Sequence, residues 1–213
     1  MVQIAPSMLA ADFLHLEKDV EMVNANADLF HLDIMDGVFV PNISYGFPVV
    51  EAIAKIATKP LDTHLMIIEP EKYVERFVKA GSAMVSFHLN ATQDPDAVLA
   101  QIRSLGAKAG LVINPDIPVE SLFPHLKNCD FVMLMSVFAG FGGQKFIEET
   151  YSRVEKLKAE IDAQGLDIPI EVDGGVSASN AADLVKAGAE ILVAGSAVFK
   201  AEDPALIIEQ MRG

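Results

Sequence analysis

Cysteine is almost absent from the sequence, because Cys129 is the only one, so no disulfide can form within the chain. A chain without disulfides fits a reducing compartment, and we expect Cys129 to be a small buried residue rather than a nucleophile. The amino-terminal segment lacks the basic stretch and the long apolar stretch of a secretory signal. No uninterrupted apolar run reaches the roughly 18 residues of a membrane-spanning helix. These absences predict a soluble cytoplasmic protein.

Positive charge is also scarce, since 16 Lys and Arg residues stand against 30 Asp and Glu residues, a net charge of −14. Nucleic acids and anionic membranes are bound by clustered Lys and Arg side chains, so both are excluded as expected partners. An anionic substrate would have to be held by local backbone dipoles or by a metal ion rather than by the overall field.

Eight short apolar runs alternate with longer amphipathic segments along the 213 residues, of which 51% are hydrophobic. Most of these runs lack strict alternation, which is typical of strands that are buried on both faces of a parallel sheet. The runs cover residues 2–7, 28–34, 61–67, 83–88, 108–114, 130–136, 168–174 and 190–196. The clearest helical patterns between them cover residues 70–82, 94–108, 146–165 and 177–190.

The alternation of strands and helices, without a linker or a low-complexity segment, predicts an α/β protein with a (β/α)8 TIM barrel fold. We expect residues 1–213 to form a single catalytic domain of this kind. A doubly wound open sheet is the alternative, but it usually has fewer strands, and no GxGxxG motif follows the first run. Because barrels of this kind often self-associate, a homo-oligomer is also expected.

Polar side chains gather near the carboxyl ends of the runs, which is where barrels of this type place their chemistry. His31 and Asp33 lie in the second run, His64 in the third and Asp173 in the seventh. A lone histidine in a strand is more often a hydrogen-bonded core residue than a ligand. A buried aspartate, however, costs several kcal/mol unless it is paired or bound to a metal. The four side chains could therefore converge on one divalent cation, such as Zn²⁺, Fe²⁺, Mn²⁺ or Co²⁺.

Three glycine-containing loops follow the last three runs, at residues 140–144, 173–175 and 194–196. Glycine allows the backbone to approach a ligand closely and lets successive N–H groups point at an anion. In barrels, the loops after the seventh and eighth strands frequently form a phosphate site together with a short helix, which residues 195–199 could begin. The loops together predict a phosphorylated substrate.

Six motifs in this order resemble the ribulose-phosphate 3-epimerases over essentially the whole chain: IAPSMLAADF, HLDIMDGVFVPN, THLM, GFGGQ, IEVDGG and VAGSAVF. The resemblance implies a (β/α)8 barrel that carries one divalent metal ion. It also implies an isomerase of the pentose phosphate pathway that interconverts D-ribulose 5-phosphate and D-xylulose 5-phosphate. Inverting a carbon beside a carbonyl requires proton removal on one face and proton return on the other, which two carboxylates flanking an enediolate can perform.

The resemblance also implies roles for individual residues. The acid/base pair would be Asp33 and Asp173, and the metal ligands would be His31, Asp33, His64 and Asp173. Substrate contacts are expected from Ser7, His64, Gly140, Phe141, Gly142, Gly143, Gly174, Gly175, Gly195 and Ser196. Packing near the reacting carbons is expected from Met35, Met66 and Met135.

The chain departs from the family pattern at Phe138 and Ala139, where the family usually has Asn-Pro ahead of the glycine loop. We expect the loss of proline to free a backbone N–H and loosen the loop, and Phe138 to add bulk near the sugar. A 3-epimerase of another ketose phosphate, such as D-allulose 6-phosphate, is therefore the alternative function. His88 has no role that the sequence can assign.

Two other function classes are less well supported by the sequence. A barrel lyase or decarboxylase commonly needs a lysine on a barrel strand, but none of the eight runs has a lysine at its carboxyl end. A non-catalytic phosphosugar-binding protein would not require two acids and two imidazoles at one mouth of a barrel.

Overall fold

Eight parallel strands form one sheet in the computed structural model, which describes residues 2–213. From β2 to β8 each strand pairs with the next one in the sequence, and β8 pairs with β1. An isolated parallel bridge between Ser7 and His31 links the end of β1 to β2, so the sheet is a nearly closed barrel and not an open sheet. The strands are β1 (Gln3–Pro6), β2 (Phe30–Met35), β3 (Leu61–Met66), β4 (Ser82–His88), β5 (Lys108–Ile113), β6 (Phe131–Met135), β7 (Ile170–Asp173) and β8 (Ile191–Ala194). The predicted (β/α)8 barrel is confirmed.

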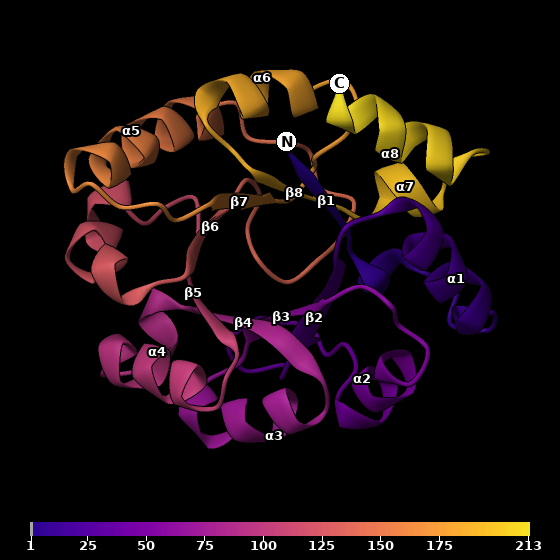
Figure 1. Ribbon diagram of the computed structural model, residues 1–213, viewed down its shortest axis with the longest axis horizontal. Coiled ribbons are helices and arrows are strands. Elements are labelled where there is room, and N and C mark those ends of the chain that lie inside the picture. The colour runs from indigo at the N-terminus through magenta and orange to yellow at the C-terminus, as the bar shows by residue number, and fades with distance from the viewer. Residues whose placement is uncertain (1) are drawn as a thin grey trace.

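Helices surround the barrel on its outside (Figure 1). The α-helices are α1 (Leu16–Asn26), α2 (Phe47–Ala54), α3 (Val74–Lys79), α4 (Pro95–Ser104), α5 (Thr150–Ala163), α6 (Ala181–Ala187), α7 (Ser196–Phe199) and α8 (Pro204–Arg212). The 3-10 helices are η1 (Met8–Ala10), η2 (Pro70–Lys72), η3 (Leu89–Ala91) and η4 (Val119–Asn128). Between β5 and β6, η4 stands in place of an α-helix.

The predicted helices are shorter in the structure than their apolar patterns suggest. The segment 70–82 divides into η2 and α3, because Tyr73 with a φ of −121° interrupts the helical backbone, and β4 already begins at Ser82. The segment 177–190 contributes only α6, which ends where Gly188 adopts a φ of 119°. Apolar spacing marks the faces that pack on the barrel, but backbone conformation decides where each helix begins and ends.

Most of the apolar core lies between the outside of the barrel and the helices, and a second cluster fills the barrel interior near the strand starts. That interior cluster contains Met84, Phe131 and Ile191, among others. Gly110 on β5 makes room for it, because a Cβ atom there would lie 2.3 Å from Cζ of Phe131. An apolar floor thus closes one end of the barrel, which leaves the carboxyl ends of the strands for polar side chains.

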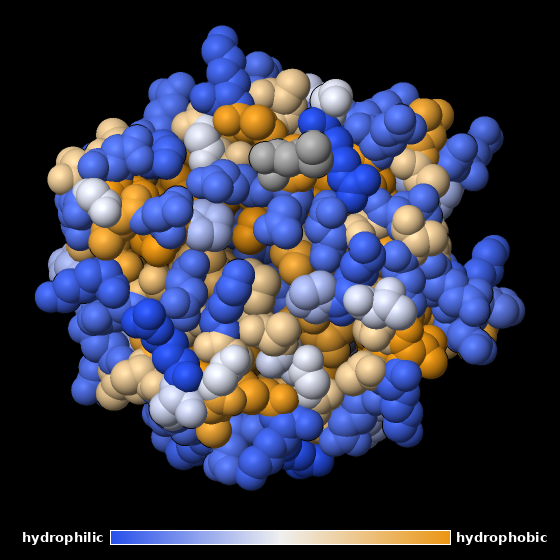
Figure 2. Space-filling view, in the orientation of Figure 1, coloured by the Kyte–Doolittle hydropathy of each residue, from blue (hydrophilic) through white to orange (hydrophobic). Residues whose placement is uncertain are grey.

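The surface is largely hydrophilic on the face that Figure 2 shows, and apolar residues are scattered among the hydrophilic ones. Cys129 is 4% exposed, and burial raises the pKa of its thiol to about 12, as expected for a structural rather than a reactive cysteine. Over residues 2–213, no helix combines the length and the hydrophobicity that crossing a bilayer requires.

Candidate active site

Strand alternation brings the polar side chains of β2 and β3 together inside the barrel. Residues two apart on a strand point to the same side of the sheet, so His31 and Asp33 share a face, as do Asp62 and His64. The register of the two strands pairs His31 with Asp62 and Asp33 with His64. Asp173 enters the same interior from the last position of β7.

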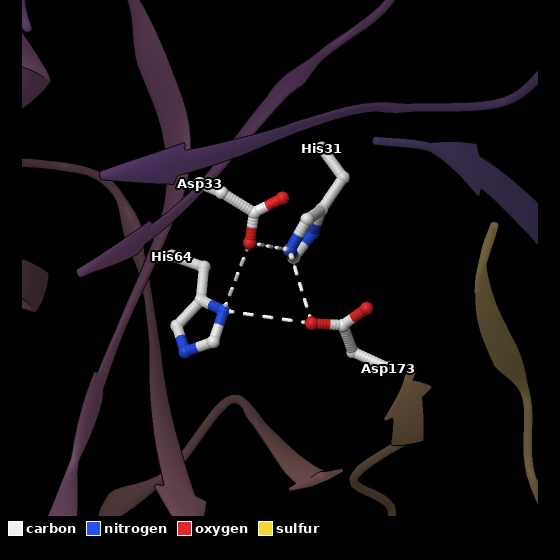
Figure 3. A group of neighbouring side chains, drawn as sticks. All are labelled: His31, Asp33, His64 and Asp173. Atoms are coloured by element: carbon white, nitrogen blue, oxygen red, sulfur yellow. Dashed lines mark ion pairs between the residues drawn. The ribbon is translucent and has the colours of Figure 1, made fainter. Parts of the chain in front are cut away.

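Four side chains from three strands surround one point at the mouth of the barrel (Figure 3). Nε2 of His31 lies 3.5 Å from Oδ1 of Asp33 and 3.9 Å from Oδ2 of Asp173. Nδ1 of His64 lies 3.5 Å and 3.8 Å from the same two oxygens. The four atoms all lie within 4.8 Å of one another, so the structure brings together the residues that the sequence predicted as a metal site.

The donor atoms of this cluster fit a divalent cation. His31 and His64 are completely buried, yet Nε2 of His31 and Nδ1 of His64 have no hydrogen-bond partner among the described residues. The separations of 3.5–3.9 Å exceed normal hydrogen-bond lengths. Four ligands about 2.1 Å from one tetrahedral ion would lie roughly 3.4 Å from one another. Two imidazole nitrogens and two carboxylate oxygens can therefore hold a metal, and this set suits Zn²⁺ and its first-row neighbours.

A second layer of side chains holds the cluster in place. Nδ1 of His31 donates to Oδ2 of Asp62 at 2.6 Å, and Oγ of Ser7 donates to Oδ2 of Asp33 at 2.5 Å. Nε2 of His64 lies 2.9 Å from Nε2 of His88, the histidine that had no assignable role. Such partners fix the orientation of metal-binding side chains.

The surroundings push the pKa values of the two aspartates in opposite directions. Burial raises the pKa of Asp33, but the neighbouring His31 and His64 outweigh it, so the pKa of Asp33 is lowered. Burial and the negative charge of Asp33 raise the pKa of Asp173 to about 6. Burial also lowers the pKa of His31, but the carboxylates of Asp62 and Asp33 raise it well above its ordinary value.

Asp62 and Glu171 are site residues that the sequence reasoning missed. Both are completely buried below the cluster, and Oε1 of Glu171 lies 3.4 Å from Nδ1 of His31. Burial and the charge of Asp62 raise the pKa of Glu171 well above its ordinary value. The signal was present, because Asp62 precedes His64 by two residues and Glu171 precedes Asp173 by two, which places each pair on one face.

A cavity of about 400 Å³ opens above the cluster. Its lining includes most of the predicted substrate contacts and the three predicted methionines: Ser7, Met35, Met66, Met135, Gly140, Phe141, Gly142, Gly143, Gly174, Gly175, Gly195 and Ser196. Asp33 and Asp173 line it too, whereas His31 and His64 are completely buried and are not part of this lining. Asn42, Gln144 and Lys200 line the cavity without having been predicted.

The loop after β6 is tied down on several sides. Nδ2 of Asn42, from the loop after β2, donates to the carbonyl of Gly140 at 2.7 Å. Nε2 of Gln144 donates to the carbonyls of Phe138 and Phe141 at 2.7 and 2.8 Å.

The structure gives a partner to the backbone N–H that the missing proline frees. The freed N–H of Ala139 donates to Oδ1 of Asn114 at 3.1 Å, a bond that proline could not make. Asn114 directly follows β5, so this bond joins the loop to the neighbouring strand end. Phe138 and Ala139 both line the cavity. This position agrees with the expectation that Phe138 adds bulk near the sugar.

Replacing Gly175 with alanine is expected to lower the free energy of unfolding by about 1–3 kcal/mol. Its φ is +64°, and a Cβ atom there would lie 2.7 Å from the backbone nitrogen of Phe146. Gly142 is the matched control in the same cavity wall, because a Cβ there meets nothing within 4 Å. Gly142→Ala should change the unfolding free energy by less than about 0.5 kcal/mol in urea titrations. Equal effects of the two substitutions would contradict the assignment of Gly175 as a forced glycine.

Comparison with known proteins gives consistent matches over nearly the whole chain. Residues 3–199 match the ribulose-phosphate 3 epimerase family. The chain is 48% identical to a ribulose-phosphate 3-epimerase of Synechocystis sp., with 99% of this chain and 93% of that protein covered. It is 43% identical to a ribulose-phosphate 3-epimerase of Bacillus subtilis, with 100% and 99% covered. It is 45% identical to the chloroplastic ribulose-5-phosphate-3-epimerase of Arabidopsis thaliana, with 98% and 75% covered.

Solved structures of other proteins share the fold. A mutant tryptophan synthase alpha-subunit from Pyrococcus furiosus superposes with a TM-score of 0.73 at 16% identity, covering 100% of this chain and 98% of that chain. An orotidine 5'-phosphate decarboxylase from Pyrococcus horikoshii OT3 gives 0.72 at 15% identity, covering 99% of each. At such low identity these likenesses show the barrel and nothing about the reaction.

Proposed function

The chain belongs to the ribulose-phosphate 3-epimerase family and is an isomerase, and from its site we propose that it interconverts D-ribulose 5-phosphate and D-xylulose 5-phosphate with one divalent metal ion. The observation that carries the proposal is the convergence of two carboxylates and two unpartnered imidazole nitrogens beneath a cavity with glycine-rich walls. The proposal includes residues 1–213 as one catalytic domain of a cytoplasmic homo-oligomer.

Asp33 and Asp173 would move the proton at C3. Epimerisation removes this proton from one face of the carbon and returns a proton to the other face through a planar enediolate. The two carboxylates enter the cavity from β2 and β7, on different sides of the barrel (Figure 1). In each direction one carboxylate accepts the proton from carbon and the other, protonated, donates its own. No net proton is gained or lost, and the two groups exchange their protonation states.

The metal would be held by His31, Asp33, His64 and Asp173. A divalent ion there would stabilise the negative charge that develops on the substrate oxygens, worth several kcal/mol by typical estimates. Zn²⁺, Fe²⁺, Mn²⁺ and Co²⁺ all suit two nitrogen and two oxygen donors. Ser7 holds the second oxygen of Asp33 and so keeps that carboxylate turned toward the cavity.

The glycine loops would bind the phosphate of the substrate. Gly174, Gly175, Gly195 and Ser196 line the cavity, and their backbone N–H groups would donate to phosphate oxygens. Binding energy from the phosphate would then orient the reacting carbon against the carboxylates. Met35, Met66 and Met135 give the cavity an apolar wall beside the cluster, which excludes water from the intermediate.

A comparison of kcat/KM on D-ribulose 5-phosphate and D-allulose 6-phosphate tests the proposed substrate. We expect the pentulose phosphate to react faster, since the relatives that match this chain are named for ribulose phosphate. Phe138 and Ala139 in the cavity wall make the hexulose phosphate the relevant competitor. Faster turnover of D-allulose 6-phosphate would show that this hexulose phosphate is the preferred substrate. If neither compound reacted, the proposed reaction would be refuted.

A further inference from the structure

We propose that His88 is a positioning residue that fixes the tautomer and the orientation of His64. The inference rests on the proposed function, because it concerns how His64 presents a nitrogen to the metal. His88 is the last residue of β4, next to β3, which carries His64. Nothing in the proposed proton transfer or substrate binding uses His88, and the cavity lining does not include it.

The two imidazoles are in direct contact. Their Nε2 atoms are 2.9 Å apart, and their ring centroids are 5.0 Å apart with an interplanar angle of 25°. Both residues have no exposed surface, so water does not compete for this contact. Phe39 packs against the His88 ring at a centroid distance of 4.7 Å and limits its rotation.

Only one distribution of protons is compatible with this contact and with a metal at the cluster. His64 turns Nδ1 toward the oxygens of Asp33 and Asp173, so a neutral His64 that offers this lone pair must carry its proton on Nε2. That Nε2–H then donates to His88, whose Nε2 must be the acceptor. His88 therefore carries its own proton on Nδ1.

Nδ1 of His88 has no hydrogen-bond partner among residues 2–213. A buried N–H without a partner costs about 1–3 kcal/mol. An apolar side chain of similar size would avoid this cost, so packing alone does not explain a histidine at this position. Holding the proton of His64 on Nε2 does explain it.

The charge of the interior explains why the acceptor is an imidazole. His31 presents Nε2 to the cluster and is held at Nδ1 by the carboxylate of Asp62. The same region of the barrel already contains four carboxyl groups: Asp33, Asp62, Glu171 and Asp173. A neutral imidazole can accept the bond from His64 without adding a fifth negative charge where desolvation makes charge expensive.

Metal affinity of the full chain tests the inference. We expect His88→Phe, which keeps a ring but removes the acceptor, to weaken Zn²⁺ binding about 10- to 100-fold in a chelator competition. His88→Gln, whose side-chain oxygen can accept the same hydrogen bond, should bind Zn²⁺ within roughly threefold of the original protein. His125→Phe is the control, because His125 bonds to Asp96 on the outside of the barrel. Absorption spectra of the Co²⁺-loaded proteins should differ only for His88→Phe.

Each outcome separates this inference from the proposed metal site. Wild-type affinity in His88→Phe, or an equal loss in His88→Phe and His88→Gln, would overturn the role of His88 as acceptor. Failure of the unmodified protein to bind Zn²⁺, Mn²⁺, Fe²⁺ or Co²⁺ would instead overturn the metal site. If phenylalanine prevents folding, His88→Leu provides the same comparison with His88→Gln.

Discussion

Replacing Asp173 with asparagine is expected to lower kcat for epimerisation by about 10²- to 10⁴-fold, the usual contribution of a positioned acid or base. Asparagine has nearly the same shape and keeps an oxygen that can face the cluster, but it cannot accept or return the C3 proton. The rate should be measured in both directions between D-ribulose 5-phosphate and D-xylulose 5-phosphate, on protein whose metal content matches that of the wild type.

The Asp173→Asn variant should also show a characteristic pattern of deuterium incorporation in D₂O. With Asp173 replaced, Asp33 can still remove the proton of one epimer, so deuterium should enter C3 of that epimer without epimerisation. Asp33→Asn should instead introduce deuterium at C3 of the other epimer. Asp183→Asn, on the exposed side of α6, is the control and should leave both rates unchanged. If both active-site variants introduced deuterium into both epimers, the assignment of one carboxylate to each epimer would be wrong.

Removing the metal with a chelator is expected to lower kcat by about 10³-fold or more, because a loss of several kcal/mol in transition-state stabilisation corresponds to such a factor. Without the ion, the carboxylates of Asp33 and Asp173 lie close together in the cluster. The thermal midpoint should also fall, since a ligand that binds only the folded state stabilises it.

Addition of Zn²⁺, Mn²⁺, Co²⁺ or Fe²⁺ should restore the activity, and the far-ultraviolet circular dichroism should be the same before and after chelation. His31→Leu and His64→Leu should lower kcat as removal of the metal does. Each substitution removes one nitrogen donor, and neither side chain lines the cavity. Undiminished turnover by protein shown to be metal-free by elemental analysis would contradict a catalytic metal.

The barrel and the four-residue cluster could be predicted from the sequence because both depend on local patterns. Each buried strand is short and apolar, and polar residues near its carboxyl end meet those of its neighbours in any barrel. The spacing of two residues was enough to place His31 and Asp33 on one face of a strand. The position of Asp173 directly before Gly174 was enough to place it at a strand end. The direction of each side chain follows from strand alternation.

Other features depend on contacts between distant segments and could not be predicted in the same way. The bond from Ala139 to Asn114 joins residues 25 positions apart, and it pairs the N–H that the missing proline frees. The contact between His64 and His88 depends on the register of β3 against β4, which shifts between Leu61 and Asp62. Asp62 and Glu171 are exceptions, since alternation alone could have placed them below the cluster.

Turnover of D-ribulose 5-phosphate in D₂O by the metal-loaded protein is the most direct test of two carboxylates acting on opposite faces. Since one group removes the proton and a different group supplies the new one, each molecule of D-xylulose 5-phosphate should carry solvent deuterium at C3 from the first turnover. Product that retained its original hydrogen at C3 would show that a single group carries the proton across, and the proposed roles of Asp33 and Asp173 would be wrong.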